Sequence, residues 1–237
     1  MAKKDKKEKK QAKNLKKEEI KYSVATIEDA VSKLQELAGN KKRKFVESVD
    51  LAINLNIDSK QSDQSVRGSV LLPHGSGKKV RVIAFTADEA KRNDAIEAGA
   101  IMAGFEEIVS KIEGGFLDFD YCVASPDVMP KISKVAKILG PRGLMPSPKN
   151  GSVTADIKKA VSEALKGKVN FKNDKAGIVH CLAGKADFSA SNLVENIKAI
   201  AKIVKDSKPE GAKGKFIKKF YLSTTMGPSI EISVDAI

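Results

Sequence analysis

Residues 79–166 alternate short apolar strands with amphipathic helices, and this alternation constrains the fold more than any other feature of the chain. A strand that is followed by a helix and then by another strand favours a parallel sheet with helices on both faces. Thr86 is the expected N-cap of the first helix. The predicted elements are strands at residues 80–85 and 117–124 and helices at 86–99, 106–112, 127–139 and 156–166. This stretch therefore predicts a Rossmann-like, three-layer α/β domain.

The segments on either side of this stretch contain more strands than helices. Their predicted elements are helices at residues 26–38 and 192–205 and strands at 49–57, 65–72, 169–172, 177–183, 216–225 and 229–234. Each flank alone is marginal as a core, whereas the two together are comfortably large. We therefore expect a discontinuous α+β domain made of residues 22–74 plus 167–237, with 75–166 inserted into it as a second domain. Glycines at both crossings permit hinge motion.

The net charge of +13 is spread unevenly along the chain. Residues 1–21 hold ten lysines against four acidic residues, and residues 167–237 hold twelve basic against seven acidic residues, whereas 22–74 is balanced. Such a distribution favours a polyanionic partner, and nucleic acid, membrane headgroups and acidic proteins all qualify. We expect residues 1–21 to form a basic flexible tail that adds salt-sensitive, sequence-independent affinity for RNA.

Neither a membrane segment nor a disulfide framework is visible in the sequence. No apolar run reaches the roughly 18–20 residues that cross a bilayer, and the lysine-rich start is not followed by the apolar segment of a signal peptide. Cys122 and Cys181 are isolated in apolar strands, as expected of core residues in a reducing compartment. We expect a soluble cytoplasmic protein. A polybasic protein of the membrane surface would need an apolar anchor that is missing here.

Two motifs suggest bound phosphate or metal, and neither fits its pattern. Residues 74–78, His-Gly-Ser-Gly-Lys, lack the first glycine and the final Ser or Thr of a Walker motif, and a strand follows instead of a helix. No dinucleotide-binding glycine motif follows a strand elsewhere. His180 and Cys181 are neighbours in a strand and so point to opposite faces. We expect no cofactor, no metal and no enzymatic activity, with a nucleotide-using α/β enzyme as the alternative.

Four polar segments remain as candidates for binding a partner. Residues 45–48 open a strand, and residues 171–177 and 223–229 connect strands; together they offer small hydroxyls, glycine, lysine, Phe and Met, which suit folded RNA. On their residues alone, the second and third segments are better interpreted as plain loops between strands. Loop 138–151 contains three prolines and three glycines, which exclude a helix and a paired strand. It carries Arg142 and Lys149, and it either contacts RNA or only braces the inserted domain.

Five separated motifs resemble the ribosomal protein L-one family of the large subunit: residues 62–68, 72–75, 138–151, 171–177 and 224–229. The resemblance covers the chain from roughly residue 22 to its end. It implies that the first domain binds ribosomal RNA of the mobile stalk beside the tRNA exit site, and that the second domain helps to release deacylated tRNA. In bacterial members the same surface represses translation of the protein's own operon mRNA. The resemblance further implies a ribosomal protein of the cytoplasm that is a monomer when free.

Carried over residue by residue, the resemblance implies an RNA-contacting set of twelve residues: Phe45, Glu47, Ser48, Lys172, Asn173, Asp174, Lys175, His180, Ser223, Thr225, Met226 and Gly227. Ser48 and Lys172 stand where the family often has Thr and Arg. Ser48 keeps a hydroxyl group, and Lys172 keeps the positive charge but lacks the planar guanidinium group of arginine. Glu47 and Asp174 are expected to position lysines or accept hydrogen bonds from ribose. Gly227 is expected to let the RNA backbone approach closely.

Overall fold

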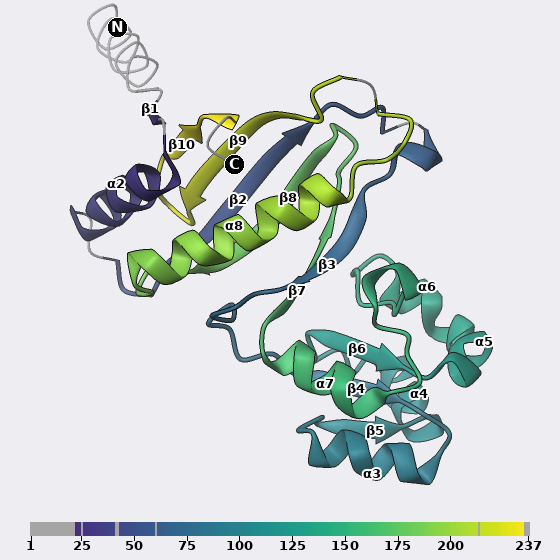
Figure 1. The fold of residues 1–237 in the computed structure, drawn as a ribbon. Coiled ribbons are helices and arrows are strands. Elements are labelled where there is room, and N and C mark those ends of the chain that lie inside the picture. The colour runs from purple at the N-terminus through teal and green to yellow at the C-terminus, as the bar shows by residue number, and fades with distance from the viewer. Residues whose placement is uncertain (1–21, 25, 41–42, 60, 213, 235–237) are drawn as a thin grey trace, which may run out of the picture.

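The structure is a computed structural model with a mixed α/β fold, in which the described strands form three sheets (Figure 1). The described residues are 22–24, 26–40, 43–59, 61–212 and 214–234. The predicted basic tail, residues 1–21, lies outside them.

The largest sheet has five strands in the order β1-β10-β9-β2-β8. These strands are β1 (Tyr22–Val24), β2 (Ser48–Leu55), β8 (Ile178–Lys185), β9 (Ile217–Thr224) and β10 (Ser229–Ile232). β2 lies between β8 and β9 and is antiparallel to both. The strand predicted at 49–57 is confirmed for residues 49–55, where every second residue is buried: Val49, Leu51, Ile53 and Leu55. β1, which the sequence did not predict, pairs parallel to β10.

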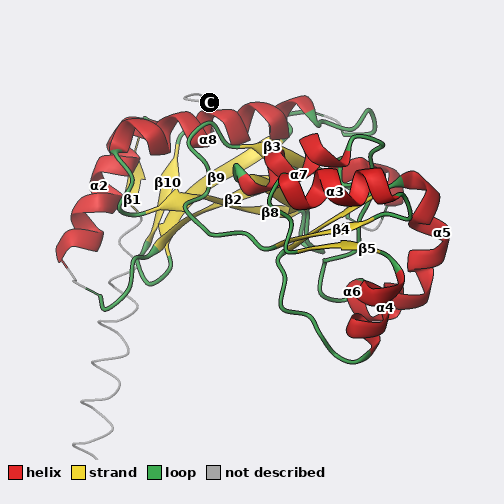
Figure 2. Cartoon of the chain, turned by 90° about the horizontal axis from the view of Figure 1, so that it is seen from below, coloured by secondary structure: helices red, strands yellow, loops and turns green. Residues whose placement is uncertain are grey.

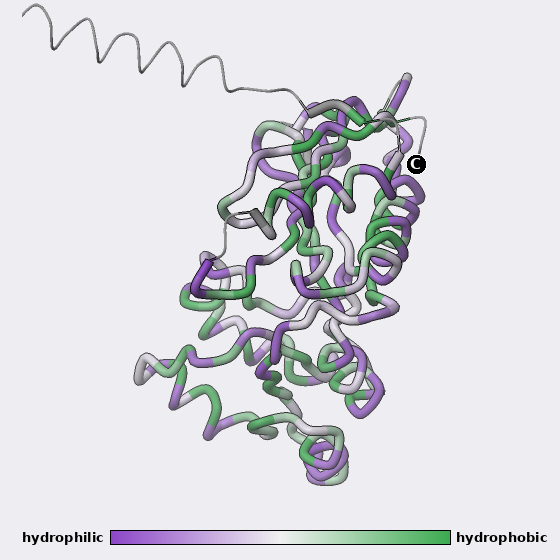
Figure 3. Tube along the Cα trace, turned by 90° about the vertical axis from the view of Figure 1, so that its left-hand side faces the viewer, coloured by the Kyte–Doolittle hydropathy of each residue, from purple (hydrophilic) through white to green (hydrophobic). Residues whose placement is uncertain are grey.

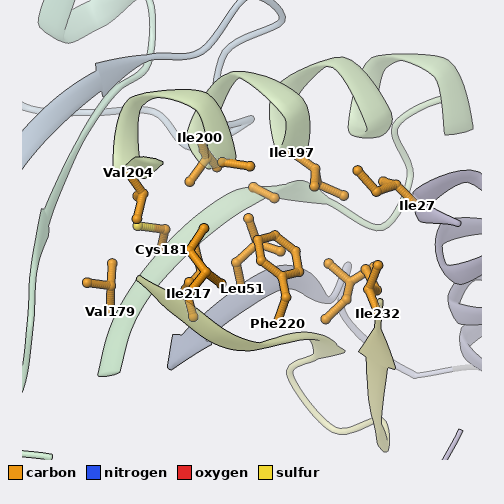
Figure 4. Close-up of a cluster of buried hydrophobic side chains, with 14 of the residues drawn as sticks. Ile27, Leu51, Val179, Cys181, Ile197, Ile200, Val204, Ile217, Phe220 and Ile232 are labelled. Carbon is orange, nitrogen blue, oxygen red and sulfur yellow. The ribbon is translucent and has the colours of Figure 1, made fainter. Parts of the chain in front are cut away.

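Two long helices, α2 (Ile27–Asn40) and α8 (Ala190–Asp206), cover one side of this sheet (Figure 2). Their apolar faces pack with the inward side chains of the strands into one core. Figure 4 shows Ile197 of α8 above Leu51 and Phe220 of the sheet. Because both helices use the same face, the opposite face of the sheet carries the outward side chains of the strands.

The inserted stretch forms a parallel sheet with β4 (Val82–Phe85) between β5 (Met102–Gly104) and β6 (Tyr121–Ala124). Alternate residues of β4 face opposite ways, so two apolar clusters form, one on each side. One cluster contains α3 (Glu89–Glu97) and α7 (Ile157–Leu165); the other contains α4 (Glu106–Glu113), α5 (Met129–Ile132) and α6 (Ala136–Leu139). The predicted three-layer α/β arrangement is therefore confirmed.

Two local predictions for this stretch are wrong. The helix expected at 127–139 is broken into α5 and α6 by 3-10 turns, η2 (Pro126–Val128) before α5 and η3 (Ser133–Val135) between the two helices. Pro130 lies in the first turn of α5, where its missing N–H leaves no helical hydrogen bond unmade and its fixed φ suits a new helix start. The N-cap of α3 is Asp88 and not Thr86, because Asp88 Oδ1 accepts the Ala90 N–H at 3.0 Å.

The two crossings between the flanking segments and the inserted stretch lie against each other. The first crossing follows β3 (Arg67–Leu71), and the second precedes β7 (Lys168–Lys172). These two strands pair antiparallel and lie between the two parts of the molecule (Figure 1). A Cβ on Gly167, whose φ is +103°, would lie 2.7 Å from the Cα of Gly75. Glycine is therefore needed at this close approach. A short 3-10 turn, η1 (Ser62–Gln64), precedes β3.

The hydropathy of the chain varies over short distances along the trace (Figure 3). Within the described residues, no helix has the length and apolar character needed to cross a membrane. Cys122 and Cys181 are buried and unpaired, and burial raises the pKa of each thiol to about 12. Both are unreactive core thiols at neutral pH, in agreement with the sequence.

Candidate nucleic-acid interface

The start of β2 and the β9–β10 turn meet at one end of the five-stranded sheet, and we call residues 45–48 and 223–227 the corner. The Thr225 N–H donates to the Ser48 carbonyl at 3.1 Å, and the Ser48 N–H donates to Thr225 Oγ1 at 3.0 Å. These two residues are 177 positions apart in sequence. The corner brings together seven of the predicted residues: Phe45, Glu47, Ser48, Ser223, Thr225, Met226 and Gly227.

Glu47 holds the corner together from inside. Its side chain is nearly buried, its Oε2 accepts the Met226 N–H at 3.2 Å, and its Oε1 lies 3.4 Å from Arg43 Nε. A hydrogen bond from the Thr224 hydroxyl, together with the Met226 N–H and the Arg43 charge, keeps the pKa of Glu47 below its ordinary value, although burial opposes this shift. Glu47 is therefore an ionised support within the corner.

The surface of the corner is apolar in spite of the high charge of the chain. Phe45, Val46 and Met226 are 52%, 50% and 59% exposed. Gly227 has a further role beside the expected one, because a Cβ at this position would lie 2.2 Å from Thr224 Oγ1. Glycine is thus required by the packing of the corner itself.

The turn between β7 and β8, residues 172–177, is ordered by its own polar side chains. Asn173 is 8% exposed; its Oδ1 accepts the Val66 N–H at 2.9 Å, and its Nδ2 donates to the Asp174 carbonyl. Asp174 Oδ1 accepts the N–H groups of Ala176 and Ile178, each at 2.8 Å. The Ile178 hydrogen bond is the main reason that the pKa of Asp174 lies below its ordinary value. Asn173 and Asp174 therefore shape the turn.

The basic residues of this turn point into solvent. Lys172 and Lys175 are exposed, and His180 of β8 has 64% of its side chain exposed. His180 Nε2 lies 3.8 Å from Asp174 Oδ2, so a protonated His180 would pair with that carboxylate. The turn therefore offers positive charge on a rigid backbone.

The corner and the β7–β8 turn lie at opposite ends of β2. Ser48 opposes Lys185 at one end, and Asn54 opposes Ile178 at the other. Six residues of extended strand separate the ends by about 20 Å. The predicted residues therefore form two groups rather than one, and a ligand that touches both must be large.

The open face of the sheet joins the two groups, and it contains residues that the sequence analysis missed. His180, Ala52 and Tyr221 are opposite each other on β8, β2 and β9. Lys219 Nζ donates to the Tyr221 hydroxyl at 3.2 Å and lies 5.9 Å from the ring centre. Tyr221 and Lys219 alternate with buried Phe220 and Leu222, so the period of two in β9 would have revealed this face.

The predicted loop 138–151 of the inserted stretch begins inside α6, whose last residues are 138 and 139, and its remainder is fixed by internal hydrogen bonds. The Ser147 N–H donates to Ser152 Oγ at 2.8 Å, and this hydroxyl donates to the Ser147 carbonyl at 3.0 Å. A 3-10 turn, η4 (Pro148–Asn150), lies within the loop. Arg142 and Lys149 are exposed and form no salt bridge with any described residue. Their charges are available to an external partner.

The chemistry of these surfaces is that of binding rather than catalysis. In the described part of the chain, no group of three or more His, Cys, Asp or Glu side chains is arranged to hold a metal ion. The acidic groups of the corner and of the turn are already used in internal hydrogen bonds. The other exposed groups of the corner and the turn are apolar side chains, hydroxyls and basic side chains, which suit bases, riboses and phosphates.

Comparisons with known proteins agree on one family. The model of the Ribosomal protein L1p/L10e family matches residues 7–228. The chain is 49% identical over 206 residues to large ribosomal subunit protein uL1c of Rhodomonas salina, covering 87% of this chain and 86% of the relative. It is 48% and 49% identical to uL1 of Alcanivorax borkumensis and Proteus mirabilis, covering 87% of each chain. The family match runs from residue 7 to residue 228, whereas the expected range was from about residue 22 to the end of the chain.

Proposed function

Since this chain belongs to the Ribosomal protein L1p/L10e family, we propose that its discontinuous domain binds ribosomal RNA of the mobile stalk of the large subunit, near the tRNA exit site. The family is structural and non-enzymatic, so the chain is a constituent of the large ribosomal subunit and not a nucleotide-using enzyme. Its location is therefore the ribosome, in the cytoplasm.

The observation that supports RNA binding most strongly is the pair of exposed side chains Phe45 and Met226 on a corner held rigid from within. Single exposed apolar side chains are ordinary on a protein surface, but Phe45, Val46 and Met226 gather at one corner, and exposed apolar groups that lie together mark an interaction site. Bases in folded RNA stack on aromatic side chains such as Phe45 and pack against apolar ones such as Met226, whereas the sugar and phosphate groups accept or donate hydrogen bonds and pair with positive charge. The corner offers all of these within one structural unit.

The predicted residues divide into two roles in this proposal. Glu47, Asn173 and Asp174 fix the backbone of the corner and of the turn, because their side chains are used internally. The remaining residues contact RNA through apolar surface, hydroxyls or charge: Phe45, Ser48, Lys172, Lys175, His180, Ser223, Thr225, Met226 and Gly227. Because the two groups lie about 20 Å apart, the proposed ligand is a folded RNA that spans the open face of the sheet.

The proposal includes the predicted domain boundaries and a separate role for the inserted domain. Residues 22–74 plus 167–237 form the RNA-binding domain, and 75–166 assists release of deacylated tRNA. Between Asp127 and Asp156 the chain carries five basic residues and no acidic residue, Arg142 and Lys149 among them. This basic segment is where tRNA phosphates would be held. Repression of the protein's own operon mRNA would use the corner again, through an RNA that imitates the stalk.

The test is to replace the exposed apolar side chains and to measure affinity for a stalk RNA fragment. Phe45→Ala should weaken binding by about tenfold, since a stacked base contributes about 1–3 kcal/mol, and Met226→Ala by about tenfold through the loss of buried apolar surface. Ile96→Ala is the matched control, because Ile96 is 51% exposed but lies on α3 of the inserted stretch. Unchanged affinity in both corner variants, or an equal loss in the control, would contradict the proposal. Urea unfolding of each variant shows whether its fold is intact.

A further inference from the structure

The first crossing between the two domains packs directly onto the turn that follows β8. A Cβ on Gly77, whose φ is +69°, would lie 2.8 Å from Lys185 Cγ and 3.0 Å from the ring of Phe188. Ser76, the preceding residue, is only 4% exposed. The crossing is therefore in close contact with the side chains at the end of β8.

Lys185 touches the corner as well as the crossing. Its Nζ donates to Ser48 Oγ at 3.2 Å, and Lys185 is opposite Ser48 in the β2–β8 ladder. The next residue, Ala186, donates its N–H to the Glu47 carbonyl at 2.9 Å. One side chain thus contacts Gly77 with its aliphatic stem and the corner with its ammonium group.

The backbone around Lys185 is anchored, so its side chain is the group that would move if the crossing shifted. The Phe188 carbonyl accepts a hydrogen bond from Gln35 Nε2 of α2 at 2.8 Å, which anchors the turn to the helical layer. The backbone of Lys185 is fixed in the sheet by its pairing with β2. A displacement of the crossing at Gly77 would therefore move the stem of Lys185, and with it the ammonium group that holds Ser48.

We propose that Lys185 is a positioning residue that links the first interdomain crossing to the corner. The affinity of the corner for RNA then depends on the position of the crossing at Gly77 against the Lys185 side chain. This inference rests on the proposed RNA-binding function. It assigns Lys185 a role exerted through Ser48 and not through a phosphate. The two roles differ in salt dependence, since loss of a phosphate contact lowers the salt slope of binding by about one.

The first experiment removes the ammonium group and keeps the stem. Lys185→Met should weaken binding of the full chain to a stalk RNA fragment by about three- to tenfold, the loss expected for one hydrogen bond, with an unchanged salt slope. In a Ser48→Ala background the same change should cause no further loss, because the residue acts through Ser48. Three results would overturn the proposal. They are an affinity of Lys185→Met equal to wild type, a salt slope of binding that is lower by one, and affinity losses of Lys185→Met and Ser48→Ala that add in the double variant.

The second experiment acts from the side of the crossing. Gly77→Ala should push on the stem of Lys185 and weaken RNA binding, whereas the same change in a Lys185→Ala background should have a smaller effect, because Cγ is gone. Gly115→Ala is the control, since Gly115 also has a positive φ, +93°, but nothing lies within 4 Å of its Cβ position. An equal loss with and without the Lys185 stem would overturn the link.

Failure of the inference and failure of the proposed function give different results. If Met226→Ala weakens binding and neither Lys185→Met nor Gly77→Ala does, the corner binds RNA and only the link is wrong. If the wild-type chain shows no preference for stalk RNA, both proposals are wrong.

Discussion

Single buried polar residues decide the geometry of the candidate interface. Glu47 and Asn173 were predicted as RNA contacts because they stand in motifs rich in contacting residues, yet each is more than nine-tenths buried and hydrogen-bonded internally. The sequence could not distinguish a residue that supports the loop from one that contacts RNA, because the same polar residue type serves either role, pointing inward or outward. The exposed Phe45 and Met226 show the opposite case, in which apolar residues point outward.

The ionised state of Glu47 makes the stability of the corner depend on pH. Because its pKa is lowered in the folded chain, its contribution is present above the unfolded value near 4.5 and is lost as pH falls through the folded value. Glu47→Gln should lower the free energy of unfolding at pH 7 by about 1–3 kcal/mol, and the gap to wild type should narrow toward pH 3.5. Urea titrations at both values check this; a gap independent of pH would contradict it.

Asn173 gives a second prediction at this scale. Asn173→Ala would leave the buried Val66 N–H without its acceptor, so it should lower the free energy of unfolding by about 1–3 kcal/mol. Lys172→Ala, next to it but exposed, should change that free energy by less than about 0.5 kcal/mol. Urea unfolding measures both variants. A similar change in the free energy of unfolding for Asn173→Ala and Lys172→Ala would show that Asn173 does not stabilise the turn.

At the scale of elements, the regular parts of the chain followed from their periodicity and the irregular parts did not. The alternation in β2 and the amphipathic pattern of α8 indicated where each element buries its side chains, whereas the same period of two in β9 was not used. The segment from Asp127 to Leu139 was predicted as one helix, yet 3-10 turns interrupt it. The three-residue strands β1 and β5 were too short to leave a periodic signal.

The contact between the two crossings makes a prediction about Gly167. Its positive φ and its 2.7 Å approach to Gly75 leave no room for a methyl group. Gly167→Ala should lower the free energy of unfolding by at least about 1 kcal/mol more than Gly115→Ala, which pays only the backbone cost of a positive φ. Chemical denaturation of both variants measures the difference, and equal losses would show that the crossings separate easily.

At the scale of the whole molecule, the discontinuous domain is a prediction from size, because either flank alone is marginal as a core. In the structure β2 pairs with β8 and β9, so strands of both flanks share one sheet. What sequence could not predict was the distance between the two groups of candidate residues. That distance depends on register, and only the pairing of Ser48 with Lys185 and of Asn54 with Ile178 reveals it.

The separate roles proposed for the two domains predict separable effects of mutation. Reversing both charges, Arg142→Glu with Lys149→Glu, should weaken binding of deacylated tRNA by at least about tenfold through lost phosphate attraction, and should leave affinity for a stalk RNA fragment within about twofold. Titrations of the same variant with each RNA check this. Equal losses for both RNAs would show that the loop does not act separately from the corner.

Recognition of a particular folded RNA by the discontinuous domain is the central claim, and a salt titration tests it most directly. The full chain is titrated with a stalk RNA fragment and with a scrambled RNA of equal length, from about 0.1 M to about 0.5 M monovalent salt, over which range charge-driven binding weakens steeply. Shape and stacking contacts are less sensitive to salt, so the preference for the stalk RNA should persist at high salt at about tenfold or more. Equal affinities for the two RNAs that fall together as the salt concentration rises would show that the chain binds RNA only through its positive charge, and would contradict the claim.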